Sequence, residues 1–546
     1  MNLIDGSPAP PPATATPGTD PAPAALPRLG GRILRGTAVV MTGSVAETGL
    51  GFLKNVLAAH YFGTTGSMDA YLVALLLPDL VMYLALTGSF TFIPLFAEAR
   101  AQSEAESWRV ASKMITYWLL LLVGGLGIAA LGTPELMHLL APGFDPAQRE
   151  RTVAMSRCLL LMSGGIAVAR VMSLPLLAQG KFAAAKAAEV AFQVASILYL
   201  VGFQSRGISA LVWGMVLGAF IQLLVIAGTL WRRRQLLHLD LDLGAPAVRR
   251  MVKLILPVYV STSATQFNSV VNRAFASLLP AGAISGLQYA MTLTEGPVSI
   301  VAASLASAAF PFLSRQYAEK RDAQAEGSAG RAILAMLVLF LPLSVGAFLL
   351  ARPIVELLLQ RGSFDRHSTE LTSAALRVYA VGIAAMAVNR FLPTAFQARQ
   401  NTTIPMQAGL VRIATSAGLC FVLVPRFAHL GVAAAAVAGE YLKLALLLVR
   451  LPRGIFRGQG WSRLGLLPRL VAATGSMAVV VLAARHSLLD AGRLTGVAVA
   501  LPLAGIVALG AVSYAAALCL LFRKESIEWL RRLTPRRVAA ASHETP

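Results

Sequence analysis

The sequence predicts an all-α polytopic membrane protein of about fourteen transmembrane helices, arranged as two six-helix lobes plus two C-terminal helices. Three observations predict this class. The chain is 56% hydrophobic and only 13% charged, apolar runs of membrane-spanning length recur along it, and its two halves repeat each other. Soluble proteins carry roughly 25% charged residues, so this chain has too little charge to cover its apolar surface in water. Lipid is therefore expected to be its main solvent.

The apolar runs define the individual helices. A bilayer core about 30 Å thick requires roughly 20 apolar residues per helix. Two of the runs, 183–204 and 207–230, lie so close together that a count of thirteen helices stays open. The predicted spans lie near residues 36–60, 69–97, 112–133, 152–178, 183–204, 207–230, 251–278, 284–312, 331–351, 369–397, 405–425, 429–449, 467–484 and 495–522.

Changes in composition divide the chain into segments. The first thirty residues are rich in Pro, Ala and Thr and have no apolar run, so a disordered cytoplasmic tail is expected and not a secretory signal. A basic and then amphipathic stretch separates the two halves and is expected to lie on the cytoplasmic membrane surface. The predicted segments are the tail (1–30), the N-lobe (31–230), the linker (231–250), the C-lobe (251–450), the last two spans (451–525) and a second cytoplasmic tail (526–546).

The basic residues indicate the orientation of the chain. The net charge of +21 can point to nucleic acid, but Lys and Arg also accumulate in the cytoplasmic loops of membrane proteins. With the N-terminus inside, 30 of the 47 Lys and Arg residues fall in inside loops, 9 in outside loops and the remaining 8 within spans. This split predicts that both termini face the cytoplasm. Orientation and contact with anionic lipids then account for the charge, so no nucleic-acid partner is expected.

Three local patterns recur in the second half of the chain. The run LAPGFD at 140–145 is matched by QRGSFD at 360–365, which lies 220 residues later. Ala178 and Ala398, which end corresponding spans, are separated by the same 220 residues. Pro94 and Pro311 are separated by 217 residues. Six spans per half is an even number, so both halves start on the same side of the membrane. Parallel repeats of this kind usually enclose a substrate site between them and rock to give alternating access.

Ionisable residues within the spans are the candidates for a substrate cavity, because they are costly at membrane depth and usually face a cavity or a partner. The first hairpins of the two halves carry most of them. Arg273 is expected near Glu295, and Lys54 near Asp69. Two alternatives stay open: Asp69 can stabilise a helix start instead, and Lys54 can snorkel to the interface. The candidate cavity residues are Glu47, Lys54, Asp69, Arg273, Glu295 and Arg390.

The sequence contains no signature of catalysis or of metal binding. It has no phosphate-binding P-loop and no His-Glu-x-x-His motif. Its three cysteines, Cys158, Cys420 and Cys519, lie in apolar stretches without the spacing of metal ligands. The loops are too short to form an extramembrane active site. The sequence therefore predicts a membrane transport protein and not an enzyme. No cofactor is expected. We expect transport to be coupled to the membrane potential or to an ion gradient.

An ordered series of short runs lies along the chain: LGFLKN at 50–55, YFG at 61–63, MDAY at 68–71, LPDL at 77–80, FIP at 92–94, APGF at 141–144, QYA at 288–290 and QRGSF at 360–364. The first five runs resemble the N-terminal signature of the MurJ/MviN lipid II flippases, and the last three continue the resemblance in order. This family belongs to the multidrug/oligosaccharidyl-lipid/polysaccharide (MOP) exporter superfamily, and the resemblance covers about residues 33–525. The family fold implies two lobes around a central cationic cavity and two C-terminal helices that line a lipid groove.

The resemblance implies roles for single residues. Lys54 matches a basic residue of the family, and Asp69 and Glu295 match acidic ones. The chain departs from the family pattern where arginines are expected, because it has Thr48, Met82-Tyr83 and Thr292 there. Arginine binds pyrophosphate through bidentate hydrogen bonds, so their loss is expected to weaken pyrophosphate binding by several kcal/mol unless other cations replace them. The available replacements are Lys54, Arg273 and Arg390.

The resemblance implies a flippase of the bacterial inner membrane. Its substrate would be an undecaprenyl-pyrophosphate-linked saccharide, either lipid II-like or an exopolysaccharide precursor. The partners would be this lipid-linked saccharide, membrane lipids and glycan synthases. Two alternatives stay open: a non-transporting scaffold of an envelope-glycan synthesis complex, and a drug or cation antiporter of the MATE type. MATE antiporters usually have twelve spans, and the last two spans of this chain argue against that alternative.

Overall fold

The computed structural model describes residues 27–231, 240, 268–452, 466–490 and 496–522, and these residues form helices and connecting turns without any strand. Eleven of their helices are long and apolar enough to cross a membrane. This confirms an all-α polytopic membrane protein. The predicted count of fourteen is not established, because α1 (Pro27–Phe62) and α3 (Leu76–Gln102) are not among the eleven and most of the predicted span 251–278 lies outside the described residues.

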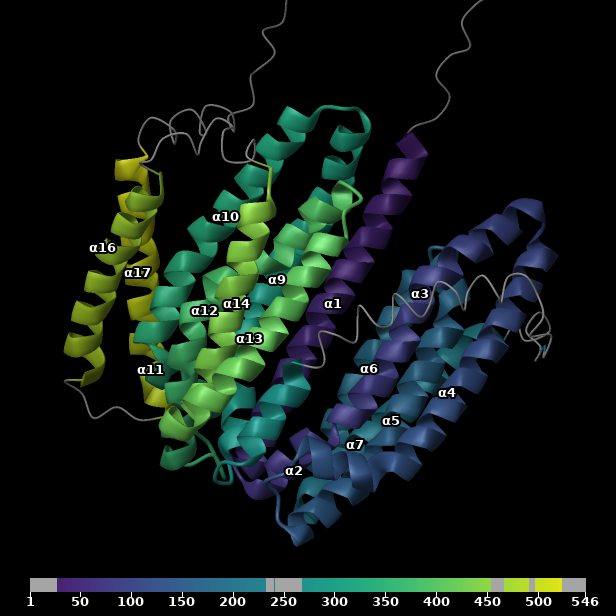
Figure 1. Cartoon of the computed structure of the whole chain (residues 1–546), viewed down its shortest axis with the longest axis horizontal. Coiled ribbons are helices and arrows are strands. Elements are labelled where there is room, and N and C mark those ends of the chain that lie inside the picture. The colour runs from purple at the N-terminus through teal and green to yellow at the C-terminus, as the bar shows by residue number, and fades with distance from the viewer. Residues whose placement is uncertain (1–26, 232–239, 241–267, 453–465, 491–495, 523–546) are drawn as a thin grey trace, which may run out of the picture.

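The helices fall into two groups that flank α1, with a hairpin at one side (Figure 1). The N-lobe comprises α1, α2 (Gly66–Ala74), α3, α4 (Glu104–Leu140), α5 (Pro146–Ala178), α6 (Phe182–Gly202), η1 (Gln204–Arg206) and α7 (Ile208–Leu230). The C-lobe comprises the helical residues 268–277, α9 (Ala283–Ala318), α10 (Asp322–Leu349), α11 (Ala351–Leu359), α12 (Arg366–Ala398), α13 (Thr403–Phe427) and α14 (His429–Arg450). The hairpin comprises α16 (Leu466–Arg485), η3 (His486–Asp490), η4 (Gly496–Val499) and α17 (Ala500–Leu521).

The lobes diverge from one end of the molecule, where α2 lies between them (Figure 1). The C-terminal hairpin packs on the C-lobe alone in the described part of the chain, against α10 and α11. Two hydrogen bonds fix it there: the Tyr514 hydroxyl donates to the Val338 carbonyl at 2.8 Å, and the Arg485 guanidinium donates to the Leu349 carbonyl at 2.9 Å. The hairpin is therefore attached to one lobe and is free of the other.

The internal repeat is visible in helix lengths and caps. The helices α5 and α12 each have 33 residues, and their first residues, Pro146 and Arg366, are separated by the same offset as Ala178 and Ala398. The residue before each helix is an aspartate whose side chain accepts a backbone N–H, Asp145 from Gln148 at 2.7 Å and Asp365 from Ser368 at 2.8 Å. This hydrogen bond lowers the pKa of Asp365 and keeps its cap ionised. The repeat is less regular elsewhere, because the chain breaks at Leu75 between α2 and α3 whereas the corresponding α9 is continuous.

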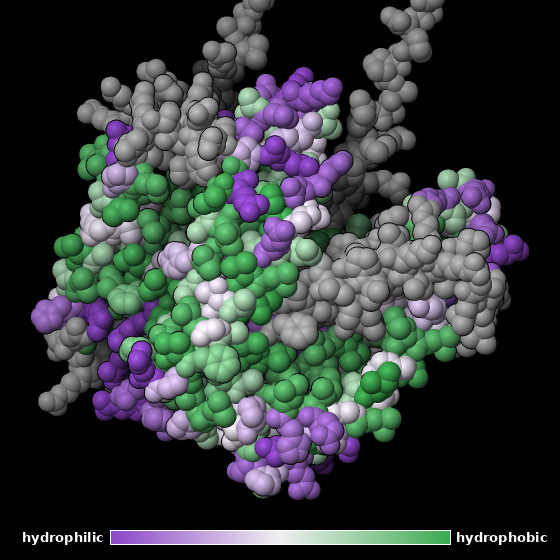
Figure 2. All heavy atoms as spheres, in the orientation of Figure 1, coloured by the Kyte–Doolittle hydropathy of each residue, from purple (hydrophilic) through white to green (hydrophobic). Residues whose placement is uncertain are grey.

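The outer surface carries a hydrophobic belt. Figure 2 shows hydrophobic side chains across the middle of both lobes and hydrophilic ones toward the two ends. Large apolar side chains point outward in this belt, such as Leu131, which is 83% exposed, and Leu501, which is 86% exposed. Water would oppose such exposure, but lipid tails would not. Of the predicted segments, the tail 526–546, most of the tail 1–30 and most of the linker 231–250 lie outside the described residues. The predicted end of the first tail is wrong, because residues 27–30 already belong to helix α1.

Candidate functional site

Backbone N–H groups of each lobe donate hydrogen bonds to the other lobe at the end near α2. The Ser363 N–H donates to the His60 carbonyl at 2.8 Å, and the Gly143 N–H donates to the Ser277 hydroxyl at 3.2 Å. The two donors lie in equivalent loops of the repeat, and each acceptor lies near the end of the first helix of the opposite lobe. The two hydrogen bonds are therefore related by the internal symmetry. We call this region the closed end, and it comprises residues 60–72, 141–145, 273–288 and 360–368.

Glycines allow this close approach. A Cβ atom on Gly143 would overlap the carbonyl oxygen of Ser277, and one on Gly63 would overlap the carbonyl oxygen of Ser363. Gly63 also has a φ of +55°, a conformation that glycine adopts without strain. Because the opposing atoms belong to the backbone, they cannot rotate away as a side chain would. The closed end can therefore form only where these positions lack side chains.

Asp69 of α2 caps a helix of the opposite lobe. Its carboxylate oxygens accept the N–H groups of Gly282 at 2.6 Å and Ser285 at 2.7 Å, at the start of α9. In the N-lobe the equivalent cap is internal, because Thr65 accepts the N–H of Met68 at 3.4 Å. Gly282 stands where the repeat places the counterpart of Thr65, and it has no side chain with which to cap its own helix. The first turn of α9 is thus capped only while the lobes are in contact, and Asp69 is 2% exposed there.

Arg273 also joins the two lobes at this end. Its guanidinium donates to the Leu72 carbonyl of α2 and to the Gln288 side-chain oxygen at 3.3 Å. It interacts electrostatically with Asp79 of α3. The expected pair between Arg273 and Glu295 is wrong, because these other groups occupy the guanidinium. Arg273 therefore belongs to the closed end, together with Asp69.

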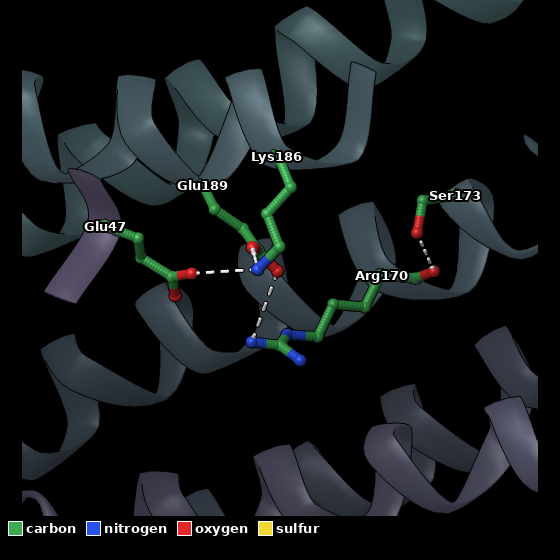
Figure 3. Close-up of polar contacts among 5 residues, drawn as sticks. All are labelled: Glu47, Arg170, Ser173, Lys186 and Glu189. Carbon is green, nitrogen blue, oxygen red and sulfur yellow. Dashed lines mark hydrogen bonds and ion pairs between the residues drawn. The ribbon is translucent and has the colours of Figure 1, made fainter. Parts of the chain in front are cut away.

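A cluster of two acids and two bases joins α1 to α5 and α6 within the N-lobe (Figure 3). The Lys186 ammonium lies between two carboxylates, at 3.0 Å from Glu47 of α1 and in contact with Glu189 of α6. The Arg170 guanidinium of α5 lies 3.7 Å from the other oxygen of Glu189. These four side chains are between 16% and 31% exposed. The cluster is electrically balanced, so its geometry points to holding α1 in place.

Lys54 lies further along α1 and has no ion pair among the described residues. It is 9% exposed, and its ammonium lies 5.1 Å from the centre of the Phe192 ring of α6. A cation over an aromatic face gains electrostatic attraction, but less than an ion pair provides when both are buried. The expected pair between Lys54 and Asp69 is wrong, because Asp69 binds the start of α9 instead.

A second cluster fills the interior of the C-lobe between α12, α13 and α14. One Glu440 carboxylate oxygen accepts the Arg412 guanidinium at 3.0 Å, and the other accepts the Asn389 amide at 2.8 Å. Glu440 and Lys443 are three residues apart on one helix, a spacing that predicts a pair. The observed partner of Glu440 is Arg412, so the carboxylate is satisfied from neighbouring helices.

Glu295 and Arg390 belong to this second cluster. Glu295 of α9 interacts electrostatically with Arg390, Glu440 and Arg412. Lys443 interacts with Arg390 and with the Arg412–Glu440 pair. Four helices of the C-lobe thus bring five charged side chains together, three positive and two negative. Helix α9 also contacts α1 and α2 of the N-lobe, so one helix carries both Glu295 of the cluster and contacts with the other lobe.

Comparison with known proteins identifies the family. A family model described as lipid II flippase MurJ matches residues 58–500, most of the chain. The chain belongs to the lipid II flippase MurJ family. The resemblance seen in the sequence is therefore confirmed. MurJ proteins are transporters of the bacterial inner membrane and not enzymes, and the apolar helices of this member fit that location.

Relatives and solved structures agree with membership of the MurJ family. A probable lipid II flippase MurJ of Bdellovibrio bacteriovorus is 29% identical over 434 residues, which are 76% of this chain and 82% of the relative. The lipid II flippase MurJ of Burkholderia cenocepacia is 25% identical over 436 residues, 76% and 83% of the two chains. A solved lipid II flippase MurJ in an inward closed conformation superposes with a TM-score of 0.74 at 19% identity, covering 89% of this chain and 99% of that one.

A more distant neighbour among solved structures shares the fold of this MurJ member. An inward-facing multidrug resistance MATE transporter of the MOP superfamily superposes with a TM-score of 0.57 at 19% identity. The superposition covers 77% of this chain and 94% of the MATE transporter. The likeness shows that the two proteins share a fold of paired lobes.

The six residues predicted for one cavity occupy four different places. Asp69 and Arg273 lie at the closed end, Glu47 in the N-lobe cluster, Lys54 against α6, and Glu295 with Arg390 in the C-lobe cluster. Most of the six residues come from the first hairpin of each half, so the predicted set does not include their partners on later helices. Arg170 and Arg390 are separated by the offset of the internal repeat, which was a signal that both clusters exist. The missed members of the clusters are Arg170, Lys186, Glu189, Arg412, Glu440 and Lys443.

Replacing Lys186 with methionine is expected to destabilise the N-lobe. The change leaves the carboxylates of Glu47 and Glu189 facing each other without the ammonium between them. Breaking a fully buried pair costs about 3–5 kcal/mol, and partial exposure of this cluster reduces the expected loss to roughly 1–3 kcal/mol. Thermal unfolding of the purified protein in detergent measures the change.

The matched control for Lys186→Met removes Glu47 as well. The double variant Glu47→Gln, Lys186→Met keeps the pair between Arg170 and Glu189 and leaves the cluster electrically balanced, so it is expected to recover most of the lost stability. A double variant less stable than Lys186→Met would contradict a cluster held by its ion pairs.

Proposed function

We propose that the chain moves an undecaprenyl-pyrophosphate-linked saccharide from the cytoplasmic to the periplasmic leaflet of the bacterial inner membrane by alternating access. The observation that carries this proposal is the closed end. Asp69 caps α9 only across the lobe boundary, so the lobes are held together at one end by bonds that separation would break. A fold closed in this way at one end can open there when it closes at the other.

The family supports a lipid-linked substrate. The curated relatives with which the chain aligns over most of its length are named lipid II flippases. Charged side chains at membrane depth support a polar headgroup, since they are costly where lipid alone surrounds them. Thr48, Met82 and Thr292 stand where the family resemblance expects arginine. These departures favour a saccharide precursor other than lipid II itself, such as an exopolysaccharide unit.

The proposed orientation places the closed end toward the periplasm. Helix α1 begins at the opposite end of the molecule, where the lobes diverge (Figure 1). With the N-terminus inside, as the distribution of basic residues predicts, this arrangement is open to the cytoplasm. A newly made lipid-linked precursor would enter from that side, supplied by glycan synthases at the inner leaflet.

The membrane potential is the proposed driving force. Flipping breaks no covalent bond, and an anionic headgroup that moves outward travels toward the positive side of the membrane. Such a movement gains about 2.3 kcal/mol per elementary charge at 100 mV. An ion gradient is the alternative source, and a proteoliposome assay in which the potential and the gradient are set separately distinguishes the two.

The test of the proposed function is transport in proteoliposomes. Labelled lipid II and a labelled undecaprenyl-pyrophosphate-linked exopolysaccharide unit are placed in separate vesicles, and their accessibility to an impermeant probe is followed with time. The protein is expected to accelerate exchange of at least one of them between the leaflets. Equal rates with and without protein for both lipids would refute the proposal and favour a non-transporting scaffold.

A further inference from the structure

Two arginines occupy equivalent positions in the two lobes. Arg170 of α5 and Arg390 of α12 are related by the offset of the internal repeat, and their helices are of equal length and start at that same offset. Arg170 lies 3.7 Å from Glu189, and its cluster contains as many acids as bases. The N-lobe thus shows how this position is neutralised when it serves packing alone.

The C-lobe position is not neutralised in the same way. Arg412 is paired with Glu440 at 3.0 Å, but neither Arg390 nor Lys443 forms a salt bridge within the part of the chain that the structure describes. Arg390 is exposed, although Asn389 before it is buried. A guanidinium at membrane depth avoids lipid because burial of its charge there is costly. Arg390 therefore faces a space that water or a polar ligand fills.

The same cluster holds an unused hydrogen-bond donor. The Nε atom of Arg412 is buried and has no hydrogen-bond partner among the described residues, and the same holds for the Nε atom of Arg170 in the N-lobe cluster. A buried donor without an acceptor costs free energy, and native proteins usually satisfy it with a protein group, water or a ligand. The two clusters differ in charge, and the excess positive charge of the C-lobe cluster favours an anionic oxygen acceptor.

We propose that Arg390 and Lys443, with Arg412 beside them, form an anion-binding subsite in the C-lobe. The ligand is an anionic oxygen group of the lipid-linked saccharide, either a phosphate of the carrier or a carboxylate of an acidic sugar. Arginine and lysine bind both groups through charge-assisted hydrogen bonds. Glu295 next to Arg390 would repel a second anion and accept a sugar hydroxyl. The subsite rests on the proposed function and is separate from the closed end.

Binding to the purified protein in nanodiscs tests the subsite. The probes are undecaprenyl pyrophosphate without sugar, and two undecaprenyl-pyrophosphate disaccharides that differ only by a hexose or a hexuronic acid. Arg390→Gln and Lys443→Gln are each expected to weaken binding on the order of tenfold. Arg390→Lys keeps the charge and is expected to retain most of the affinity. Arg170→Gln removes the same charge from the equivalent position and is expected to bind like the wild type.

The probes distinguish the two sources of the anion. If the subsite holds phosphate, the Gln variants lose affinity for the sugar-free carrier; if it holds a carboxylate, they lose affinity only for the hexuronic acid lipid. If the wild type binds none of the probes, the subsite proposal is refuted. It is also refuted if Arg390→Gln and Lys443→Gln bind all probes as tightly as Arg170→Gln does. Because binding is measured without transport, a wild type that binds but does not flip would refute the proposed function alone.

Discussion

Replacing Gly143 with alanine is expected to make the contact between the lobes unfavourable and to slow transport strongly. The added Cβ would overlap the carbonyl oxygen of Ser277 and lie 2.7 Å from the Cα of Leu278, all on the opposite lobe. Overpacking of a rigid contact typically costs about 1–3 kcal/mol and occasionally more. That cost would reduce the population with a closed end by about tenfold to a hundredfold. A protein that cannot close this end loses one of the two states that alternating access requires.

Double electron–electron resonance measures the effect of Gly143→Ala directly. Spin labels at the exposed positions Glu150 and Glu370, one in each lobe near the closed end, are expected to show a longer distance in the variant. Gly127→Ala is the matched control, because a Cβ there meets nothing within 4 Å. An unchanged distance distribution together with normal transport would show that the backbone contact is not required.

Replacing Asp69 with asparagine is expected to have the second largest effect. Asparagine keeps the shape, but its amide nitrogen would face one of the two N–H donors, Gly282 or Ser285, and the negative charge at the start of α9 is lost. Hydrogen bonds to a charged group contribute about 1.5–3 kcal/mol each. Losing one of them and the charge is expected to shift the balance away from closure by roughly tenfold to a hundredfold.

The control for Asp69→Asn is Thr65→Ala, which removes the equivalent cap within the N-lobe. Both variants uncap one helix, but only Asp69→Asn weakens a bond between the lobes. The lobe distance is therefore expected to lengthen in Asp69→Asn and to stay at the wild-type value in Thr65→Ala. Equal lengthening in both would mean that the loss of a helix cap, and not the cross-lobe bond, causes the change.

The fold class was predictable because it depends on local sequence properties. Apolar runs of sufficient length require a membrane, and the constant offset of the repeat aligns α5 with α12 residue for residue. The caps at Asp145 and Asp365 follow from their position before a helix. The number of spans was less predictable, since α1 is helical at the predicted place yet is not apolar enough to count among the eleven candidate spans.

The charged residues of the candidate site were predictable singly but not in their pairing. Membrane depth alone distinguishes Glu295 or Arg273 from a surface charge. Which groups meet depends on the rotation and tilt of each helix, and periodicity fixes neither. Arg273 therefore donates to the Leu72 carbonyl and Glu295 interacts with Arg390, whereas the sequence predicts that Arg273 and Glu295 pair with each other.

The glycines of the closed end carried no such signal. A glycine beside a helix terminus usually indicates a turn, and nothing local shows that Gly143 faces a distant stretch of backbone at Ser277. Its role depends on the absence of a side chain at a contact between distant segments. Only the packing of the two lobes reveals that requirement.

The contacts at the closed end determine how the contact between the lobes responds to ionic strength. In the described part of the chain, no salt bridge within 4 Å joins one lobe to the other. The seal consists of hydrogen bonds, including those of the buried Asp69 and of Arg273, and of the electrostatic interaction between Arg273 and Asp79. Dissolved ions weaken exposed charge pairs over distances of about 10 Å at 0.1 M, but they barely affect buried groups. The closed end is therefore expected to be equally stable at low and at high ionic strength. A change in the salinity around the bacterium would then not separate the lobes of its flippase.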